Sequence, residues 1–506
     1  MIGKVYLVGA GPGDEGLITV KALTKIKQAD VILYDRLANP KLLDEAEDDV
    51  ELFYVGKKAG NHYRSQEEIN QLLVDKAKEG KEIVRLKGGD PFIFGRGGEE
   101  AEVLAREGIS FEIIPGITSP ISVAAYAGIP LTHRDFSSSV AFVTGHEDPS
   151  KEESSVNWDY LAKGVETLVT LMGVGNLAKI ANRLMKAGKD PQTPVALIRW
   201  GTRPEQESIV GNLENIAAKV EEADFNPPAI TIIGDVVTLR DKLNWFEKKS
   251  LFGKDIVVTR PKKQATSFCK ALAREGANVV EAPAIKIEAP DDYQRLDESI
   301  GQLKEYDWII FTSINGVKYF FARLFELGKD ARALGDIKVC AIGPKTAQAV
   351  KDNGIKVDYL PDDYVSEAIV KGFAKKDLTG KKFLLPRANI AREMLSDELE
   401  KFGAEVDNIT AYKTVAGSGE EDLTAKLKAD EIDLVTFTSS STVDNFIKKI
   451  GGGYQELLEN TKIAAIGPIT ASTAEDFGLE VDIIADEYTI EGLLRAIKKH
   501  YKAINN

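Results

Sequence analysis

A glycine-rich segment over residues 84–100 (VRLKGGDPFIFGRGGEE) carries the densest set of residues that could do chemistry. Five of its 17 residues are glycine, and Lys87, Asp90, Arg96 and an apolar stretch, Pro91–Phe94, stand beside them. Glycine has no Cβ, so the backbone of such a segment can approach a ligand closely. A loop with a purely structural role does not need this mixture of residue types. We therefore expect the segment to bind a small ligand.

A second glycine motif, GAGPGD at residues 9–14, follows the first apolar run and is similar to a dinucleotide fingerprint. Asp35, at the end of the next apolar run, stands where a ribose-binding acid would be. The third glycine of that fingerprint would fall at position 14, which is Asp, and Pro12 removes an N–H from the loop. The sequence therefore does not favour a dinucleotide site, and a tight turn without a ligand remains an alternative.

These motifs need an α/β scaffold to position them. Apolar runs of five to seven residues alternate with longer amphipathic stretches, as in Val5–Val8, Leu17–Ile26 and Val31–Tyr34. This alternation predicts an α/β fold with a mainly parallel sheet, in which ligands bind at the carboxyl ends of the strands. A chain of 506 residues is expected to form about three domains at roughly 150 residues each.

The main domain boundary is predicted near residue 248. The strand-like segment 229–237 (AITIIGDVV) is followed by a charged stretch over 238–251, which holds Trp245 and Phe246. Residues 253–261 (GKDIVVTRP) then resemble a fresh first strand. We therefore expect one domain over residues 1–247 and another over residues 248–506.

The second half contains an internal repeat. Residues 307–317 (DWIIFTSINGV) precede 338–347 (KVCAIGPKTA), and residues 433–443 (DLVTFTSSSTV) precede 462–471 (KIAAIGPITA) at nearly the same spacing. In each case a buried strand ends in Thr-Ser before a helix start, which gathers hydroxyl and N–H groups at one sheet edge. The repeat predicts two similar α/β units with a ligand site in the cleft between them.

Charge and composition exclude several partners. Lys and Arg number 65 against 79 Asp and Glu, a net charge of −14, so the chain has little attraction for nucleic acid or an anionic membrane. Cys269 and Cys340 form no CxxC pattern, and the four histidines have no ligand spacing. No apolar stretch is long enough to span a membrane, and the first strand enters a glycine-rich turn instead of a cleavage site. We expect a cytoplasmic protein with reduced thiols and no metal.

Residues 1–245 resemble uroporphyrinogen-III C-methyltransferase. The motifs that carry the resemblance are GAGPGD at 9–14, LYDRL at 33–37, VGKKAG at 55–60, residues 84–100, PGITS at 115–119, AGIPLTHR at 127–134, VTGH at 143–146 and LMG at 171–173. The resemblance implies a two-lobed methyltransferase that binds S-adenosyl-L-methionine without a dinucleotide fingerprint and methylates uroporphyrinogen III to precorrin-2. It also allows a homodimer through this domain.

The same resemblance implies individual roles. Asp35 would accept a proton and Lys57 would donate one. Ser119 stands where the family usually has alanine, a change that keeps the backbone contact. The residues that would contact S-adenosyl-L-methionine are Pro12, Gly88, Gly89, Asp90, Ile93, Thr118, Ser119, Met172 and Gly201.

Residues 253–500 resemble uroporphyrinogen-III synthase. The motifs are VVTRP at 257–261, FTSINGV at 311–317, AIGPKTA at 341–347, LLPRA at 384–388, YKT at 412–414, FTSSSTV at 437–443 and AAIGPITA at 464–471. The resemblance implies two lobes joined by a two-stranded link, the first lobe being completed by the returning chain. It also implies closure of linear hydroxymethylbilane with inversion of the last ring. The product of this synthase is the substrate of the methyltransferase, so the two resemblances support each other.

In the synthase-like half, Tyr412 is the candidate catalytic residue. The candidate substrate-binding residues are Arg260, Thr312, Ser313, Ser439 and Thr470, with Lys345 and Arg387 as further carboxylate partners. Helix capping explains the serine and threonine hydroxyls equally well, and packing in a half-buried strand is the alternative for Tyr412.

The leading hypothesis is a bifunctional tetrapyrrole enzyme that could serve sirohaem or cobalamin synthesis. One alternative is that the first half methylates another tetrapyrrole, or RNA, although the acidic charge disfavours RNA. Another is that the second half is a non-catalytic module that senses a tetrapyrrole.

Overall fold

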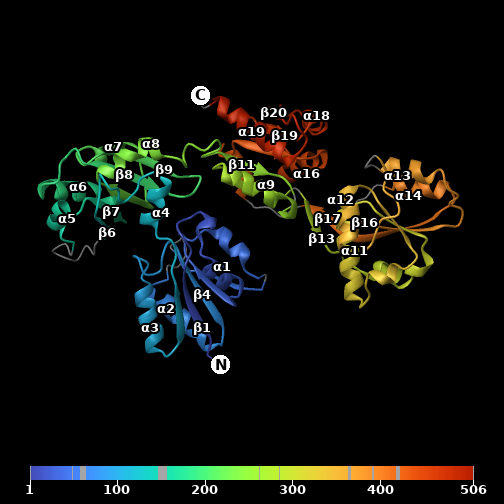
Figure 1. Cartoon of the computed structure of the whole chain (residues 1–506), viewed down its shortest axis with the longest axis horizontal. Coiled ribbons are helices and arrows are strands. Elements are labelled where there is room, and N and C mark those ends of the chain that lie inside the picture. The colour runs from blue at the N-terminus through green and yellow to red at the C-terminus, as the bar shows by residue number, and fades with distance from the viewer. Residues whose placement is uncertain are drawn as a thin grey trace. The chain divides into compact units, whose positions relative to one another are not determined.

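The computed structural model describes residues 2–47, 49–56, 64–145, 156–260, 262–283, 285–362, 366–389, 393–416 and 422–504. Its contacts divide the chain into two units (Figure 1). The first unit holds residues 1–255, 271–278 and 501–506, and the second unit holds residues 256–270 and 279–500. Within the described part of the chain, no helix is both long enough and apolar enough to span a membrane.

The first lobe of the first unit is built on a parallel sheet of order β3-β2-β4-β1-β5. Val5 and Leu7 of β1 face α2 and α3, whereas Tyr6 and Val8 face α1, because successive side chains of a strand point to opposite faces. The elements are β1 (Lys4–Gly9), β2 (Val31–Tyr34), β3 (Glu51–Tyr54), β4 (Glu82–Lys87), β5 (Ser110–Ile114), α1 (Val20–Lys27), α2 (Gln66–Lys78) and α3 (Gly97–Arg106), with short 3-10 helices η1 (Glu15–Leu17) and η2 (Pro40–Glu45).

The second lobe of the first unit has a mixed sheet of order β6-β7-β10-β8-β9. Only β6 and β7 pair in parallel, whereas β10 pairs antiparallel with both β7 and β8, and β8 pairs antiparallel with β9. The expectation of a mainly parallel sheet is therefore wrong for this lobe. Seven residues join β8 to β9, too few for the crossover that a parallel pair needs.

Helices cover this mixed sheet, and α4 connects it to the first lobe. The elements are β6 (Val140–Thr144), β7 (Thr167–Leu171), β8 (Pro194–Arg199), β9 (Glu207–Asn212), β10 (Ala229–Ile233), α4 (Ser119–Tyr126), α5 (Trp158–Gly164), α6 (Leu177–Lys186), α7 (Ile216–Glu222) and α8 (Arg240–Leu243), with η3 (Val174–Asn176) and η4 (Asp235–Leu239). Val123 and Ala124 of α4 pack in the same core as Ile198 of β8 and Ile232 of β10.

The charged stretch over residues 238–251 packs on the first unit. The ring centroids of Trp245 and Phe246 lie 5.0 and 4.8 Å from that of Tyr126, and the indole N–H of Trp245 donates to the carbonyl of Ala125 at 3.0 Å. Arg240 donates to the carbonyl of Ala127 at 2.6 Å. Phe246 is buried whereas Trp245 is 48% exposed, so burial of the Phe246 ring contributes most to the packing of this stretch against α4.

The second unit contains two sheets, of order β12-β11-β18-β19-β20 and β13-β17-β16-β14-β15. Strand β11 pairs in parallel with β18, 178 residues later in the sequence, so the returning chain completes the first of these sheets. The strands are β11 (Asp255–Val258), β12 (Asn278–Glu281), β13 (Ile285–Glu288), β14 (Trp308–Phe311), β15 (Lys338–Ala341), β16 (Lys382–Ala388), β17 (Glu405–Ala416), β18 (Leu434–Phe437), β19 (Lys462–Ala465) and β20 (Ile483–Ile484).

The internal repeat of the sequence is confirmed as a repeat of structure. Strands β14 and β15 pair in parallel and lead into α11 and α12, just as β18 and β19 pair in parallel and lead into α16 and α18. The helices here are α9 (Lys262–Arg274), α10 (Gln294–Gly301), α11 (Ile314–Glu326), α12 (Pro344–Asp352), α13 (Ser366–Phe373), α14 (Met394–Lys401), α15 (Asp422–Lys428), α16 (Ser440–Ile450), α17 (Tyr454–Leu457), α18 (Pro468–Asp476) and α19 (Ile490–Ile504), with η5 (Leu303–Glu305) and η6 (Ala331–Leu334).

Candidate active sites

Two glycine loops meet at the carboxyl edge of the first parallel sheet. The N–H of Gly11, after β1, donates to the carbonyl of Gly89 at 3.2 Å, and the N–H of Gly89, after β4, donates to the carbonyl of Gly11 at 2.7 Å. Both glycines have positive φ angles, +77° and +69°, which residues with a side chain rarely adopt. The two motifs singled out in the sequence therefore form one structure.

The loop between β5 and α4 joins them. The N–H of Gly116 donates to the carboxylate of Asp90 at 3.0 Å. A Cβ on Gly116 would lie 2.3 Å from the carbonyl oxygen of Gly89, so only glycine allows this approach. Thr118 and Ser119 follow, and a Cβ on Gly89 would stand 3.8 Å from the Cα of Thr118 and 3.7 Å from the nitrogen of Ser119.

Seven of the nine residues predicted to contact S-adenosyl-L-methionine lie in the three loops that follow β1, β4 and β5 or, in the case of Ser119, at the first residue of α4. These are Pro12, Gly88, Gly89, Asp90, Ile93, Thr118 and Ser119. Asp90 also accepts the N–H of Phe92 at 2.8 Å, which fixes the start of the apolar segment. Phe92, Ile93 and Phe94 are 52%, 40% and 43% exposed, so this segment offers an apolar surface beside the loops.

The other two predicted contacts come from the second lobe. Gly201 follows β8, and a Cβ there would lie 2.3 Å from Cγ1 of Val123 on α4. Its neighbour Thr202 accepts the N–H of Asp14 from the loop after β1, at 3.1 Å. Met172 follows β7 with a φ of +56° and a side chain that is 53% exposed. The structure thus connects Gly201 to the glycine loops and places Met172 at the end of β7, which is separated from β8 by β10.

Two residues that the sequence did not single out, Arg203 and Tyr126, help join the lobes here. The Arg203 guanidinium lies over the ring of Trp200 at 4.9 Å and donates to the carbonyl of Leu37 at 3.4 Å, and burial lowers its pKa. The Tyr126 hydroxyl donates to Asp14 at 2.7 Å, and burial together with that carboxylate raises the pKa of the phenol. Neither residue belongs to a glycine motif, so the motif spacing in the sequence could not identify them as part of the site.

Asp35, the predicted proton acceptor, stands after β2 with its side chain 25% exposed. Its Oδ1 accepts the N–H of Leu37 at 3.0 Å, and its Oδ2 accepts from Nη2 of Arg85 at 3.4 Å. Lys57, the predicted proton donor, lies outside the described residues.

Behind Asp35 lies a buried group of charges formed by Arg85, Lys87 and Glu100. Oε1 of Glu100 accepts from Nζ of Lys87 at 2.7 Å and from Nε of Arg85 at 3.2 Å. The side chains of Arg85 and Lys87 are 5% exposed and that of Glu100 is 0% exposed. Burial, followed by the charge of Arg85, lowers the pKa of Lys87, and Glu100 opposes this. The sequence signal for this group was two charged residues, Arg85 and Lys87, on either side of Leu86 in β4.

In the second unit, Thr312 and Ser313 follow β14, and Tyr412 lies on β17. The hydroxyl oxygens of Tyr412 and Ser313 are 2.9 Å apart, and the Tyr412 ring stacks on that of Tyr319 with centroids 5.7 Å apart. Tyr412 is 7% exposed. Burial raises the pKa of its phenol, while the hydrogen bond with Ser313 and the charge of Arg387 lower it.

Arg387 and Lys345, the further carboxylate partners, differ in burial. Arg387 is 6% exposed, and burial lowers the pKa of its guanidinium. It adjoins a register shift between β16 and β17, after which Ala388 pairs with Tyr412. Lys345 stands exposed in the first turn of α12.

Three further candidates lie after strands of the other sheet. Arg260 follows β11, Ser439 follows β18, and Thr470 lies in α18, the helix after β19. The N–H of Ser439 donates to Oγ1 of Thr442 at 3.2 Å, and its own Oγ lies 3.0 Å from that of Ser441. Thr470 is 5% exposed in the first turn of α18, and burial lowers the pKa of Arg260. The structure thus gathers the candidates into two sets, one on each sheet of the second unit.

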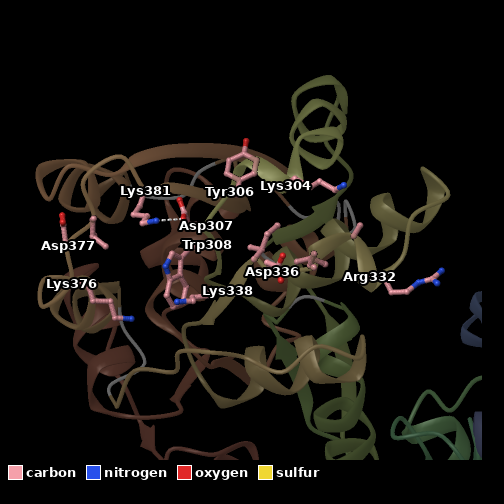
Figure 2. A pocket seen from close by; sticks show the side chains of 15 residues that line it. Lys304, Tyr306, Asp307, Trp308, Arg332, Asp336, Lys338, Lys376, Asp377 and Lys381 are labelled. Atoms are coloured by element: carbon pink, nitrogen blue, oxygen red, sulfur yellow. Dashed lines mark hydrogen bonds and ion pairs between the residues drawn. The ribbon is translucent and has the colours of Figure 1, made fainter.

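A hollow of about 770 Å³ opens at the opposite end of β14 and β15 (Figure 2). It is lined by the residues at the amino ends of these strands, among them Asp307, Trp308 and Lys338, and Lys381 pairs there with Asp307 at 2.8 Å. Thr312 and Ser313 stand at the carboxyl end of β14, so this hollow is separate from the candidate site. Among the described residues, no group of three or more His, Cys, Asp or Glu side chains could hold a metal ion.

Comparison with known proteins assigns each half of the chain to a family. Residues 4–217 match the family described as tetrapyrrole (corrin/porphyrin) methylases, and residues 267–495 match the family described as uroporphyrinogen-III synthase HemD. The chain is 37% identical over 494 residues to the porphyrin biosynthesis protein HemD of Ruminiclostridium josui, covering 97% of each chain.

Two further relatives match the chain in part. The uroporphyrinogen-III C-methyltransferase of Bacillus subtilis is 43% identical over 368 residues, which is 73% of this chain and 75% of that protein. The S-adenosyl-L-methionine-dependent uroporphyrinogen III methyltransferase of Methanosarcina barkeri is 58% identical over 241 residues, which is 48% of this chain and 94% of that protein.

Proposed function

The chain belongs to the family of proteins that join a tetrapyrrole methylase to a uroporphyrinogen-III synthase, and we propose that it catalyses both reactions. Its second half closes hydroxymethylbilane to uroporphyrinogen III, and its first half methylates that product to precorrin-2. The observation that carries the proposal is the match of two families in tandem along one chain. A relative named as a porphyrin biosynthesis protein is similar over 97% of its own length. Precorrin-2 would then serve sirohaem or cobalamin synthesis.

The glycine loops of the first lobe fit S-adenosyl-L-methionine. The backbones of Gly9, Gly89 and Gly116 approach so closely that a Cβ on Gly9 would lie 2.4 Å from the nitrogen of Gly116. Such loops leave backbone groups uncovered by side chains, which a ligand can then reach. The residues that would hold this group are Pro12, Gly88, Gly89, Asp90, Ile93, Thr118, Ser119, Met172 and Gly201. When bound, it supplies a methyl group already activated by a sulfonium centre.

Since the methyl donor is already activated, the chain's own task is to align the pyrrole carbon and to manage protons. Asp35 is proposed to accept the proton that the macrocycle loses from another position when its fully substituted pyrrole carbon gains the methyl group. Its position after β2, at the same sheet edge as the glycine loops, supports this role. Lys57 is proposed as a proton donor only because it lies in the motif VGKKAG at 55–60, which resembles that of the family.

In the second half, Tyr412 is proposed to donate a hydrogen bond to the hydroxyl that leaves hydroxymethylbilane. Its buried phenol and its hydrogen bond with Ser313 support this role, because a buried hydroxyl with a fixed partner is held in one orientation. The carboxylates of the substrate would be bound by Arg260, Thr312, Ser313, Ser439 and Thr470, with Arg387 and Lys345 as further partners.

We place this chemistry in two domains, residues 1–247 and 248–506, that work in the cytoplasm. Cys269 and Cys340 are both buried and form no disulfide, as is usual for proteins of a reducing compartment. A homodimer through the methyltransferase half is supported by the family resemblance of that half. Sedimentation of the purified chain as a monomer at micromolar concentration would contradict the dimer.

The function is tested by supplying the purified chain with hydroxymethylbilane, with and without S-adenosyl-L-methionine. We expect uroporphyrinogen III in the absence of S-adenosyl-L-methionine and precorrin-2 in its presence, separated by chromatography. Formation of only the non-inverted type I isomer, which arises without an enzyme, would contradict the synthase activity and favour a tetrapyrrole-sensing module. Type III product that is never methylated would contradict the methyltransferase activity.

A further inference from the structure

Glu100, on α3, is a fully buried carboxylate that the proposed chemistry does not use. Its Oε1 accepts three hydrogen bonds, from Lys87 at 2.7 Å, Arg85 at 3.2 Å and Gln66 at 3.2 Å. Its Oε2 is buried without a hydrogen-bond partner in the part of the chain that the structure describes. A carboxylate in this state is rare, because leaving a buried acceptor without a partner is unfavourable.

Stability does not account for this group. Taking Glu100, Arg85 and Lys87 out of water carries a desolvation cost, which is visible in the lowered pKa of Lys87. Buried ion pairs can often be replaced by apolar side chains with no loss of stability, or with a gain. The sheet around them is already filled by apolar residues such as Ile83, Val84 and Leu86. The charges are therefore better explained by what they hold in place.

What they hold is Asp35. The three nitrogens of the Arg85 guanidinium donate to three different acceptors: Nε to Glu100 at 3.2 Å, Nη1 to the carbonyl of Leu86 at 3.1 Å, and Nη2 to Asp35 at 3.4 Å. A planar guanidinium bound on its other sides can present its last edge in only one direction. The N–H of Leu37 holds the other oxygen of Asp35 at 3.0 Å, so the carboxylate is fixed at both ends.

We propose that Glu100 is a positioning residue for methyl transfer, which acts by locking Arg85 so that Arg85 orients the carboxylate of Asp35. Lys87 holds Glu100 in this arrangement through the shorter of the two ion pairs. The inference rests on the proposed role of Asp35 as proton acceptor. It gives a function to Arg85 and Lys87 of β4 and to Glu100, the last glutamate of the glycine-rich segment.

A double-mutant cycle on the full chain tests the proposal. The four proteins are the wild type, Asp35→Asn, Glu100→Gln and the double variant. Each is measured for kcat and KM of methylation with uroporphyrinogen III and for the Kd of S-adenosyl-L-methionine. Asp35→Asn should lower kcat by on the order of 10²–10⁴, the loss typical of a general base.

Glu100→Gln should lower kcat by about 10- to 100-fold, the loss that is typical when the outer partner that orients a metal ligand is removed. The KM and the Kd of S-adenosyl-L-methionine should stay within about twofold of wild type. The double variant should be no slower than Asp35→Asn, since a positioning residue has no effect once the group that it positions is gone. Multiplicative losses, or a wild-type kcat for Glu100→Gln, would overturn the proposal. A wild-type kcat for Asp35→Asn would instead overturn the role of Asp35 itself.

Two further variants serve as an independent test and as a control. Arg85→Lys keeps the positive charge but replaces the planar guanidinium by a single nitrogen, which cannot occupy the positions of both Nε and Nη2. It should therefore lower kcat to a similar extent even if Glu100→Gln fails to fold. A folded Arg85→Lys protein with wild-type kcat would overturn the proposal. Glu102→Gln removes a charge from the exposed face of the same helix and should leave kcat unchanged.

Discussion

The hydroxyl oxygen of Tyr412 lies 2.9 Å from that of Ser313, although 99 residues separate them in the sequence. The same Ser313 oxygen accepts the N–H of Gly316 at 2.9 Å and so caps α11. The sequence predicts two alternative roles for Ser313, as a helix cap and as a substrate-binding residue. The structure is compatible with both roles, because the hydroxyl caps α11 and contacts Tyr412 at the same time. The pair places a buried phenol next to the carboxyl end of β14, in a sheet whose strands β14, β15, β16 and β17 run parallel and whose edge strand β13 is antiparallel.

Replacing Tyr412 with Phe should lower the rate of type III formation by at most roughly 10²–10³, the lower part of what acid catalysis supplies. The effect is modest because the substrate loses water readily, and the enzyme's main task is to hold its chain in position. Initial rate and the ratio of type III to type I product, measured by chromatography, check this. Tyr306→Phe is a matched control, because it removes a different hydrogen-bonded phenol hydroxyl, which donates to the carboxylate of Asp407 at 2.6 Å. Tyr306 lines the hollow at the opposite end of the sheet, so this variant should keep the wild-type rate. A folded Tyr412→Phe protein at full rate would show that the tyrosine only packs.

Replacing Ser313 with Ala should reduce both stability and rate. The loss of the cap should cost about 0.5–2 kcal/mol, seen as a lower denaturation midpoint. The phenol of Tyr412 would lose its partner, so the rate of type III formation should fall by less than in Tyr412→Phe. Ser396→Ala removes a buried serine hydroxyl elsewhere in the same lobe and should leave the rate unchanged. A larger loss of rate in Ser313→Ala than in Tyr412→Phe would show that Ser313 acts directly on the substrate.

Replacing Gly89 with Val should weaken S-adenosyl-L-methionine binding strongly and leave ring closure unaffected. Its φ of +69° disfavours any residue with a Cβ, and the new side chain would point toward Thr118 and Ser119. Gly108 has the same φ of +69°, and a Cβ there would have no neighbouring atom within 4 Å, so Gly108→Val introduces the strain away from the site. Calorimetry should find near-normal binding in Gly108→Val. Equal weakening in both variants would remove Gly89 from the binding site.

The two halves should work separately. The motifs of each half are complete on either side of residue 248, and fragments 1–247 and 248–506 should each fold and keep their own activity. The first fragment loses the contact between Phe246 and Phe252, whose ring centroids lie 5.3 Å apart, so its denaturation midpoint should be slightly lower than in the whole chain. A second fragment that folds yet makes no uroporphyrinogen III, while the whole chain does, would contradict the prediction.

Glu112 on β5 should stabilise the first lobe in a pH-dependent way. Lys21 and Lys4, the latter at 2.8 Å, hold its pKa at about 2, below the ordinary 4.5. A lowered carboxyl pKa stabilises the fold above pH 4.5, and this contribution is lost as the pH falls toward 2. The denaturation midpoint of Glu112→Gln should therefore lie below that of the wild type at pH 6, and the two should converge between pH 4.5 and 2. A difference that does not change with pH would contradict the ion pairs.

Much of the architecture could be predicted from local sequence. The alternation of apolar runs and amphipathic stretches is a local property of the chain, and it identified strands such as β1 and β2. The repeated Thr-Ser segments marked the ends of β14 and β18, because a strand end before a helix start needs hydroxyl caps. The glycine segments were identifiable for a similar reason, since a positive φ at Gly11 and Gly89 restricts the residue type at those positions.

Tertiary structure decided what depends on contacts between distant residues. The mixed sheet of the second lobe follows from how β10 inserts between β7 and β8, which local pattern does not specify. The packing of Trp245 on Tyr126 turns an apparently charged link into part of the first unit. The sequence showed Glu100 as one of two adjacent glutamates, and only the fold shows that it is buried between Arg85 and Lys87 behind Asp35. Charge and hydropathy are properties of single residues, whereas burial and hydrogen-bond partners belong to the assembled structure.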